Sequence, residues 1–384
     1  MKKRLLSLGL AVAMAASLTA CGSSGGSAET KAPAGETKAA DAAGTETKAA
    51  EEAAESAGGV FKIGGIGPIT GGAAVYGLAV KNAAELAVKE INEAGGINGM
   101  QVEFKFEDDE HDAEKSVNAY NSLKDWGMQM LMGTVTSTPC TAVVEKTHED
   151  NMFQLTPSGS AVESIKYDNA FRVCFSDPGQ GTASAKYIGE NKLASKVAVI
   201  YNSSDVYSSG VYQKFAEEAK NQDFEVVSAE AFTEDSKTDF SVQLQKAKDA
   251  GADMVFLPIY YTEASLIITQ ANKMGYAPQF FGCDGLDGLI GVENFDQSLA
   301  EGVMLLTPFA ADAYDAIYAI KLAAEKENVT PDMSVSDICE AMKKGMTEIT
   351  LEGLTGTITW TASGEPDKEP KAVKIENGAY TAME

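Results

Sequence analysis

From Val60 onward, short apolar runs typical of strands alternate with longer segments whose apolar residues recur every three or four positions. The run Phe61–Ile66 predicts a strand, and the spacing in Tyr76–Ala94 predicts a helix. Further strands are expected at Gln101–Phe106, Met128–Met132 and Phe153–Leu155, with helices at Ala113–Trp126 and from Pro139. This strand–helix–strand rhythm predicts a mostly parallel sheet covered by helices.

A second series of the same kind begins near residue 196. Its expected strands are Lys196–Tyr201, Phe224–Phe232, Asp253–Ile259 and Gln279–Gly282, and its helices are Ser209–Lys220, Phe240–Gly251 and Thr262–Gly275. Two α/β series in one chain predict two similar lobes with a cleft between them. Ligands of such sheets bind beyond the carboxyl ends of the strands, so the residues after each strand are candidates for function.

Two turns of the first series are rich in hydroxyl side chains. Met132 is followed by GTVTSTP, in which Ser137 or Thr138 is expected to cap a helix whose first turn holds Pro139. Leu155 is followed by TPSGS. Each turn predicts free backbone N–H groups and hydroxyls at a helix N-terminus, which suit a carboxylate, although helix capping alone also explains either turn.

The second series offers the opposite chemistry. Tyr260, Tyr261 and Glu263 follow the strand that ends at Ile259, and Asp284 follows Gly282. One lobe therefore supplies anion-binding donors, and the other supplies aromatic rings and a carboxylate. This combination is complementary to a zwitterion.

The start of the chain carries export signals. Lys2, Lys3 and Arg4 precede the apolar run 5–18, and small residues lead to Cys21. Residues 1–20 are typical of a secretory signal peptide. The sequence Leu-Thr-Ala-Cys at 18–21 resembles the bacterial lipobox, whose Cys is acylated; the alternative is an ordinary signal peptide with an incidental Cys21.

The segment 21–59 is expected to be a lipid-anchored, disordered tether. After Cys21 it contains no Val, Leu, Ile or Phe, so it has no apolar surface with which to offset the entropy of ordering. As a flexible coil it would span roughly 35 Å. We expect the protein to work at the extracytoplasmic face of the cell membrane.

Composition excludes several functions. The net charge of −25 argues against nucleic acid. The four remaining cysteines, Cys140, Cys174, Cys283 and Cys339, lack metal-site spacing and are either small buried residues or partners in one or two disulfides. His111 lies in the acidic run 107–112, which reads as a solvated loop in preference to a metal site. No metal, cofactor or nucleophile–base pair is expected, which argues against an enzyme.

The chain from Val60 to its end resembles the leucine/isoleucine/valine-type substrate-binding components of ABC importers. The resemblance is carried by IGGIGPITGGAAVYG at 63–77, AVKEINEAGGINGMQVEF at 87–104, GTVTSTP, LTPSGS, and QFFGCDG at 279–285. It implies an α/β type I periplasmic-binding-protein fold with two Rossmann-like lobes, a hinge and a ligand cleft. We assign 60–174 and 308–345 to the first lobe, and 175–307 and 346–384 to the second.

The resemblance also implies site residues. The ligand carboxylate would meet Ser137, the backbone at Ser158, and Ser160. The ammonium group would meet Asp284, where the leucine binder has Glu, and Tyr260. Aromatic positions of the side-chain pocket fall on Tyr76 and Tyr207, the latter with an exposed loop position as the alternative.

The chain departs from the family after the expected strand Gly302–Leu306. Thr307-Pro308-Phe309 leads directly into AADAYDAIYAIK, where such proteins have a further helix and loop, so about 25 residues are missing by typical element lengths. The expected site residues lie outside this gap, but it adjoins an interlobe crossing.

The resemblance implies a monomeric, lipid-anchored capture protein that binds an amino acid, by default a branched-chain one, by lobe closure. It would deliver its ligand to an ABC permease and its ATPase. A ligand-sensing protein of a signalling system is the alternative, followed by an enzyme. The exact ligand stays open.

Overall fold

The structure of the protein is a computed structural model that describes residues 59–306, 310–368 and 371–383. The expected signal peptide, Cys21, the tether as far as residue 58, and the join at residues 307–309 lie outside the described residues. Among the described residues, none of the helices combines the length and apolar character that crossing a membrane requires.

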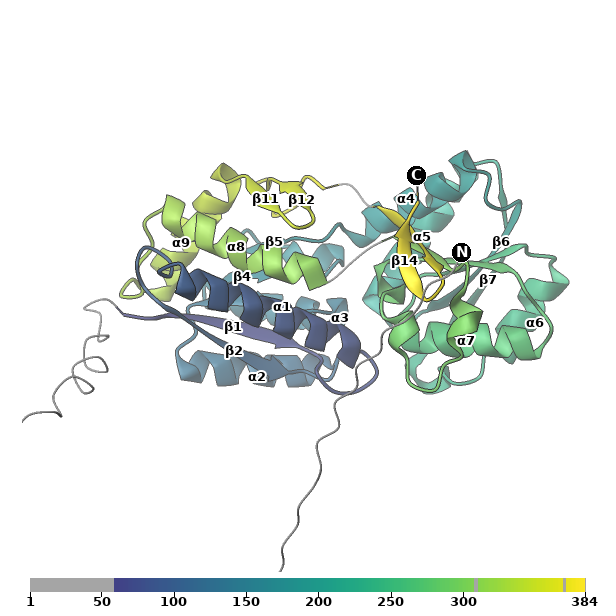
Figure 1. Ribbon diagram of the computed structural model, residues 1–384, viewed down its shortest axis with the longest axis horizontal. Helices are drawn as coiled ribbons and strands as arrows, with labels where there is room; N and C mark the ends of the chain where they lie inside the picture. The colour runs from purple at the N-terminus through teal and green to yellow at the C-terminus, as the bar shows by residue number, and fades with distance from the viewer. Residues whose placement is uncertain (1–58, 307–309, 369–370, 384) are drawn as a thin grey trace, which may run out of the picture. The chain divides into compact units, whose positions relative to one another are not determined.

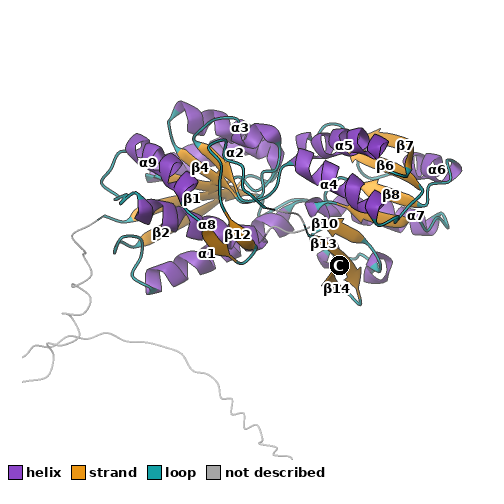
Figure 2. Ribbon diagram, turned by 90° about the horizontal axis from the view of Figure 1, so that it is seen from above, coloured by secondary structure: helices purple, strands orange, loops and turns teal. Residues whose placement is uncertain are grey.

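The first lobe is built on a parallel sheet with the strand order β2-β1-β3-β4-β5. Its strands are β1 Phe61–Gly67, β2 Val102–Asp108, β3 Met130–Gly133, β4 Phe153–Thr156 and β5 Ala170–Arg172, connected by helices α1 Ala74–Glu93, α2 Ala113–Trp126 and α3 Ser137–Glu149 and by the 3-10 turn η1 Val162–Ile165. Figure 2 shows helices on both sides of the strands. Strand β1 is buried on both faces, as expected for a central parallel strand.

The second lobe has the strand order β14-β13-β10-β9-β8-β6-β7. Its parallel strands are β6 Lys196–Asn202, β7 Glu225–Phe232, β8 Met254–Leu257, β9 Gln279–Gly282 and β10 Met304–Leu306, and the antiparallel β13 Ala372–Glu376 and β14 Ala379–Ala382 extend the edge. The helices are α4 Asp177–Glu190, α5 Val206–Glu218, α6 Ser241–Asp249 and α7 Tyr261–Lys273. Short 3-10 turns are η2 Ala219–Asn221, η3 Glu234–Ser236, η4 Asp284–Leu286, η5 Leu289–Gly291 and η6 Gln297–Ala300.

Both α/β series predicted from the periodicity are confirmed, with ends that differ by a few residues. The series could be predicted because the apolar pattern specifies which face of each element is buried. In α1, for example, Val80, Ala84, Ala87 and Ile91 are buried at the helical spacing.

The C-terminal part of the chain returns to the first lobe (Figure 1). Helix α8, Ala310–Lys326, packs against α1, and α9, Val335–Glu348, packs against α8 and β4. The hairpin β11–β12, Leu351–Gly353 and Gly356–Ile358, packs on α8, where Asp315 accepts hydrogen bonds from Leu354 N and Thr355 N. The second sheet is rejoined only at β13, later than the boundary expected at residue 346, because this hairpin bonds to α8.

Cys140, Cys174, Cys283 and Cys339 are buried and unpaired. Of the two alternatives for these residues, the small buried side chain is therefore the one that the structure contains. Burial raises the pKa of each thiol, most strongly for Cys174 and Cys283. Such thiols are poor nucleophiles.

Candidate functional site

The turn after β3 brings Thr136 and Ser137 to the carboxyl edge of the first sheet. Thr136, not Ser137 or Thr138, is the N-cap residue of α3, and its hydroxyl lies 2.8 Å from His111 Nδ1 instead of capping the helix. Ser137 Oγ accepts a hydrogen bond from Ala161 N at 3.1 Å. The hydroxyl proton of Ser137 is therefore not used for capping and can be donated elsewhere.

The turn after β4 is organised by Thr156. Its hydroxyl oxygen accepts hydrogen bonds from Gly159 N at 2.7 Å and from Ser158 N at 3.3 Å. The turn leads into η1, a 3-10 helix of only four residues. The helix expected after this turn is therefore a single 3-10 turn, and so short a helix has little dipole.

Hydroxyls from the two turns meet. Ser137 Oγ and Ser160 Oγ lie 3.4 Å apart, and both residues are almost fully buried. Ser158 donates its hydroxyl proton to Val135 O at 2.6 Å, so it fastens one turn to the other. The structure thus brings the three predicted serines together in one hydroxyl-rich corner of the first lobe.

The three predicted tyrosines also form a cluster. Tyr260 is the N-cap residue of α7, and its ring stacks on Tyr207 of α5 at a centroid distance of 5.0 Å. Tyr76, from α1 of the first lobe, lies 5.7 Å from Tyr260. Tyr207 is only 2% exposed, which excludes the exposed loop position considered for it.

Gly285 forms hydrogen bonds with the hydroxyl groups of two of these tyrosines. Its N–H donates to the Tyr207 hydroxyl at 3.0 Å, and its carbonyl accepts a hydrogen bond from the Tyr76 hydroxyl. A Cβ at position 285 would lie 2.6 Å from Ile259 O and 2.7 Å from the Tyr207 hydroxyl, so the close approach requires glycine.

Asp284 begins η4 at the end of β9 and is 3% exposed. Its Oδ2 accepts a hydrogen bond from Gln180 Nε2 at 2.8 Å, whereas its Oδ1 is buried without a hydrogen-bond partner among the described residues. Burial raises the pKa of this carboxyl to about 7. The site therefore contains a carboxylate that lacks a cation.

Asp177 is a second such carboxylate, which the sequence analysis missed. It occupies the first position of α4, is 1% exposed, and neither of its side-chain oxygens has a hydrogen-bond partner among the described residues. Burial raises its pKa well above the usual range, the side chain of Ser160 and the Arg172 guanidinium oppose this rise, and the carboxylate of Asp284 adds to it. An acid in the first turn of a helix is common for dipole reasons alone, so the sequence carried no signal that set Asp177 apart.

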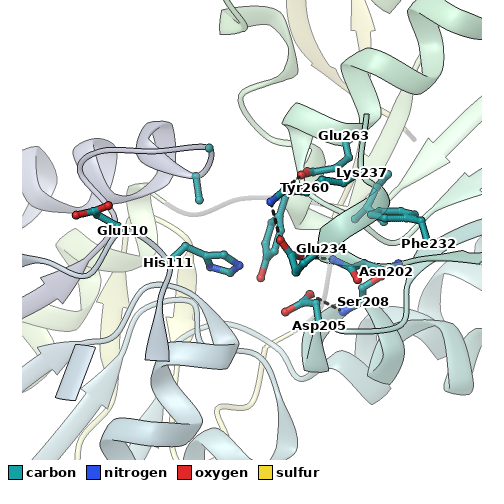
Figure 3. Close-up of a pocket in the computed structure, with 13 residues that line it drawn as sticks. Glu110, His111, Asn202, Asp205, Ser208, Phe232, Glu234, Lys237, Tyr260 and Glu263 are labelled. Atoms are coloured by element: carbon teal, nitrogen blue, oxygen red, sulfur yellow. Dashed lines mark hydrogen bonds and ion pairs between the residues drawn. The ribbon is translucent and has the colours of Figure 1, made fainter. Parts of the chain in front are cut away.

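A cavity of about 90 Å³ adjoins the Tyr260 ring (Figure 3). The first lobe contributes Gly72, Ala73, Glu110 and His111, and the second contributes Asn202, Asp205, Ser208, Phe232, Glu234, Lys237, Ile259, Tyr260 and Glu263. The His111 ring meets the Tyr260 ring edge-on at 5.1 Å, and Lys237 pairs with Glu234 at 2.6 Å. The cavity has both polar and apolar walls and is lined by residues of both lobes.

The acidic run 107–112 is in part the solvated loop that was expected, since Glu110 and Asp112 are exposed and only Asp109 and His111 turn inward. Asp109 is fully buried, and His111 turns toward the cavity, where burial lowers its pKa. Among the described residues, no group of His, Cys, Asp and Glu side chains is arranged to hold a metal ion.

Hydrogen bonds cross from lobe to lobe around these residues. Tyr76 bonds to Gly285, Thr262 Oγ1 donates to Gly72 O at 2.7 Å, and Thr138 Oγ1 donates to Asp205 Oδ1 at 3.0 Å. The serines, the tyrosines and the two carboxylates are thereby enclosed between the lobes.

Two α/β lobes that enclose polar groups at the carboxyl ends of their strands define a two-lobed binding protein. The chain belongs to the periplasmic binding protein family, whose model matches residues 60–319.

Similar proteins share most of the chain. Leu/Ile/Val-binding protein homolog 3 of Brucella melitensis is 29% identical over 329 residues, which are 79% of this chain and 88% of that protein. The substrate-binding protein LivJ of the branched-chain amino acid transporter of Streptococcus pneumoniae, solved with isoleucine, superposes with a TM-score of 0.76 at 26% identity, covering 84% of this chain and 99% of that one. A solute-binding protein of R. palustris solved with benzoate has the same fold, with a TM-score of 0.74 at 18% identity and coverages of 85% and 96%.

Proposed function

We propose that this protein is the extracytoplasmic solute-binding component of an ABC importer and that it captures a branched-chain amino acid between its lobes. The observation that carries the proposal is the opposite polarity of the two sides of the cleft. Ser137 and Ser160 offer hydroxyls on the first lobe, and Asp284 and Asp177 offer buried carboxylate oxygens that have no partner on the second.

In this proposal the ligand carboxylate meets Ser137, Ser160 and the backbone at Ser158. Its ammonium group lies between Asp284, Asp177 and Tyr260. A buried carboxylate without a partner is costly, and an ammonium group that binds there offsets this cost.

The side chain of the ligand is proposed to pack between Tyr76 and Tyr207, whose rings are buried. The relatives described as Leu/Ile/Val-binding proteins and the neighbour solved with isoleucine support an aliphatic amino acid. The buried cysteines, whose thiol pKa values are raised, favour a binding protein over an enzyme.

We further propose that Cys21 is acylated and that residues 22–58 tether a monomeric binding unit to the outer face of the cell membrane, within reach of a permease and its ATPase. The unit would consist of residues 60–174 with 310–368 in one lobe, and 175–306 with 371–383 in the other.

A thermal-shift screen of the full-length chain against the twenty amino acids tests the proposed function. A ligand present at 100 times its Kd stabilises the folded state by about 2.7 kcal/mol, so leucine, isoleucine or valine is expected to raise the melting temperature measurably. The proposal would be overturned if none of these three shifted the transition and isothermal titration calorimetry detected no binding.

A further inference from the structure

The turns that are proposed to hold the ligand carboxylate contain no charged side chain. Residues 133–139 and 156–161 supply hydroxyls and backbone N–H groups only. A carboxylate taken out of water needs a source of positive potential as well as donors, because the Coulomb attraction to a nearby cation offsets part of its desolvation.

Arg172 lies directly behind the second turn. It is the last residue of β5, and its positively charged guanidinium group is fully buried. Its Nη1 donates to three successive carbonyl oxygens, those of Gly159, Ser160 and Ala161. The guanidinium group thus orients these three carbonyl groups of the turn toward itself.

One of these peptides links Arg172 to the predicted site. The carbonyl of Ser160 accepts from Arg172, and the N–H of the same peptide, which belongs to Ala161, donates to Ser137 Oγ at 3.1 Å. Hydrogen bonds in such a series polarise one another. Because Ser137 Oγ already accepts a hydrogen bond from Ala161 N, its own hydroxyl proton is directed elsewhere.

The position of Arg172 is itself fixed from the far side of the turn. Its Nη2 pairs with Glu365 Oε1 at 3.0 Å, its N–H donates to Gly364 O at 3.1 Å, and its carbonyl accepts from Trp360 Nε1 at 2.7 Å. The side chain of Glu365 is 40% exposed whereas that of Arg172 is fully buried, so water screens the charge of the glutamate more than that of the arginine.

We infer that Arg172 is a positioning residue for the carboxylate half of the site, acting through the Ser160–Ala161 peptide on Ser137. The inference rests on the proposed function. It gives the carboxylate half of the cleft a buried positive charge behind its turns, while Asp284 supplies a negative charge for the ammonium group.

The test compares L-leucine with L-leucinamide, which keeps the ammonium group and the side chain but has no carboxylate. Both are titrated calorimetrically into the full-length chain and into the variants Arg172→Lys and Glu365→Gln. The lysine keeps the charge but loses the fork that reaches several carbonyls, so leucine affinity should fall about tenfold while leucinamide affinity stays within about twofold. Glu365→Gln should change the leucine-to-leucinamide ratio in the same direction by about threefold.

Glu149→Gln, which breaks an exposed ion pair with Lys146 far from the turn, is the matched control and should leave the ratio unchanged. Equal losses for both probes, or no loss for leucine, would show that Arg172 only supports the fold and would overturn the inference. Thermal unfolding reports whether Arg172→Lys is folded; if it is not, an unchanged ratio in Glu365→Gln overturns the inference. Failure of the unaltered chain to bind leucine would instead overturn the proposed function, and the inference with it.

Discussion

The buried carboxylates of Asp284 and Asp177 favour a ligand that carries a positive charge. Between them, three of their four carboxylate oxygens have no hydrogen-bond partner among the described residues. Folding places them there at a cost in stability, which is typical of residues that serve binding and not structure.

The isosteric change Asp284→Asn should weaken leucine binding by at least about tenfold, because a neutral amide removes one of the two carboxylates proposed to face the buried ammonium group. Titration calorimetry measures the effect. Asp296→Asn, at an exposed helix cap, serves as the control. Unchanged affinity in Asp284→Asn would remove Asp284 from the ammonium site.

The same substitution, which is expected to weaken ligand binding, should increase the stability of the ligand-free protein at neutral and higher pH. Because burial raises the pKa of Asp284 from 3.8 to about 7, the folded protein holds a proton that the unfolded chain releases between these values. The stability contributed by protonated Asp284 is therefore present below about pH 4 and is lost as the pH rises through about 7.

In the absence of ligand, Asp284→Asn should thus be more stable than the unaltered chain at pH 8, by up to about 4 kcal/mol, and nearly equal to it at pH 4. Urea unfolding at both pH values measures the difference. A difference independent of pH would contradict the buried, uncompensated state of this carboxyl.

At the scale of elements, helix α1 contacts the second lobe through Tyr76 and the neighbouring Val75 N–H, which donates to the Tyr261 hydroxyl at 3.2 Å. The Tyr76 hydroxyl donates to Gly285 O and accepts from Tyr261 N at 3.3 Å, and both partners belong to the second lobe. These bonds exist only when the lobes are in contact.

Tyr76→Phe should therefore lower ligand affinity as well as stability, each by about 1 kcal/mol, the net value of a buried hydrogen bond. Tyr120→Phe is a matched control, because the Tyr120 hydroxyl bonds to Asp150 within the first lobe. It should lower stability alone. Calorimetric titration and urea unfolding separate the two effects, and equal affinities for the two variants would contradict the role of Tyr76 in closure.

The hairpin β11–β12 depends on one residue of α8. Both oxygens of Asp315 accept hydrogen bonds from the turn of the hairpin, at Leu354 N, Thr355 N and Thr355 Oγ1.

Asp315→Ala should cost about 2 kcal/mol of stability, because buried N–H donors lose their acceptor. Hydrogen exchange should become faster in residues 351–358 and stay unchanged in β13 and β14. Equal acceleration in both regions would place the hairpin with the second sheet.

At the scale of the whole molecule, the proposed lipid anchor and the binding unit are independent. Changing Cys21 to Ala should release the protein from the membrane fraction while leucine affinity stays the same, since the tether contains no Val, Leu, Ile or Phe with which to pack against the lobes. Fractionation and calorimetry of the same preparation test both statements, and retention in the membrane fraction would contradict acylation of Cys21.

The spacing of apolar residues was sufficient to predict both α/β series. A helix that buries one face and a strand that buries both faces each have a characteristic local spacing of apolar residues. The turns after β3, β4, β8 and β9 were found from the sequence for the same reason: parallel strands place their carboxyl ends at one edge. The resemblance then added Tyr76 and Tyr207. The role of Asp177 had no local signal, because its distinguishing property is the lack of a partner.

The sequence alone therefore determined the elements, the two lobes and the polarity of the proposed site, since these follow from residue type and spacing. Only the tertiary structure decided that Ser137 is free of capping, that Asp177 and Asp284 share one buried region, and that the hairpin after α9 stays with the first lobe. Each of these features depends on contacts between residues that are far apart in the chain. The energy of a buried polar group is set by the groups that surround it in space and not by its neighbours in sequence.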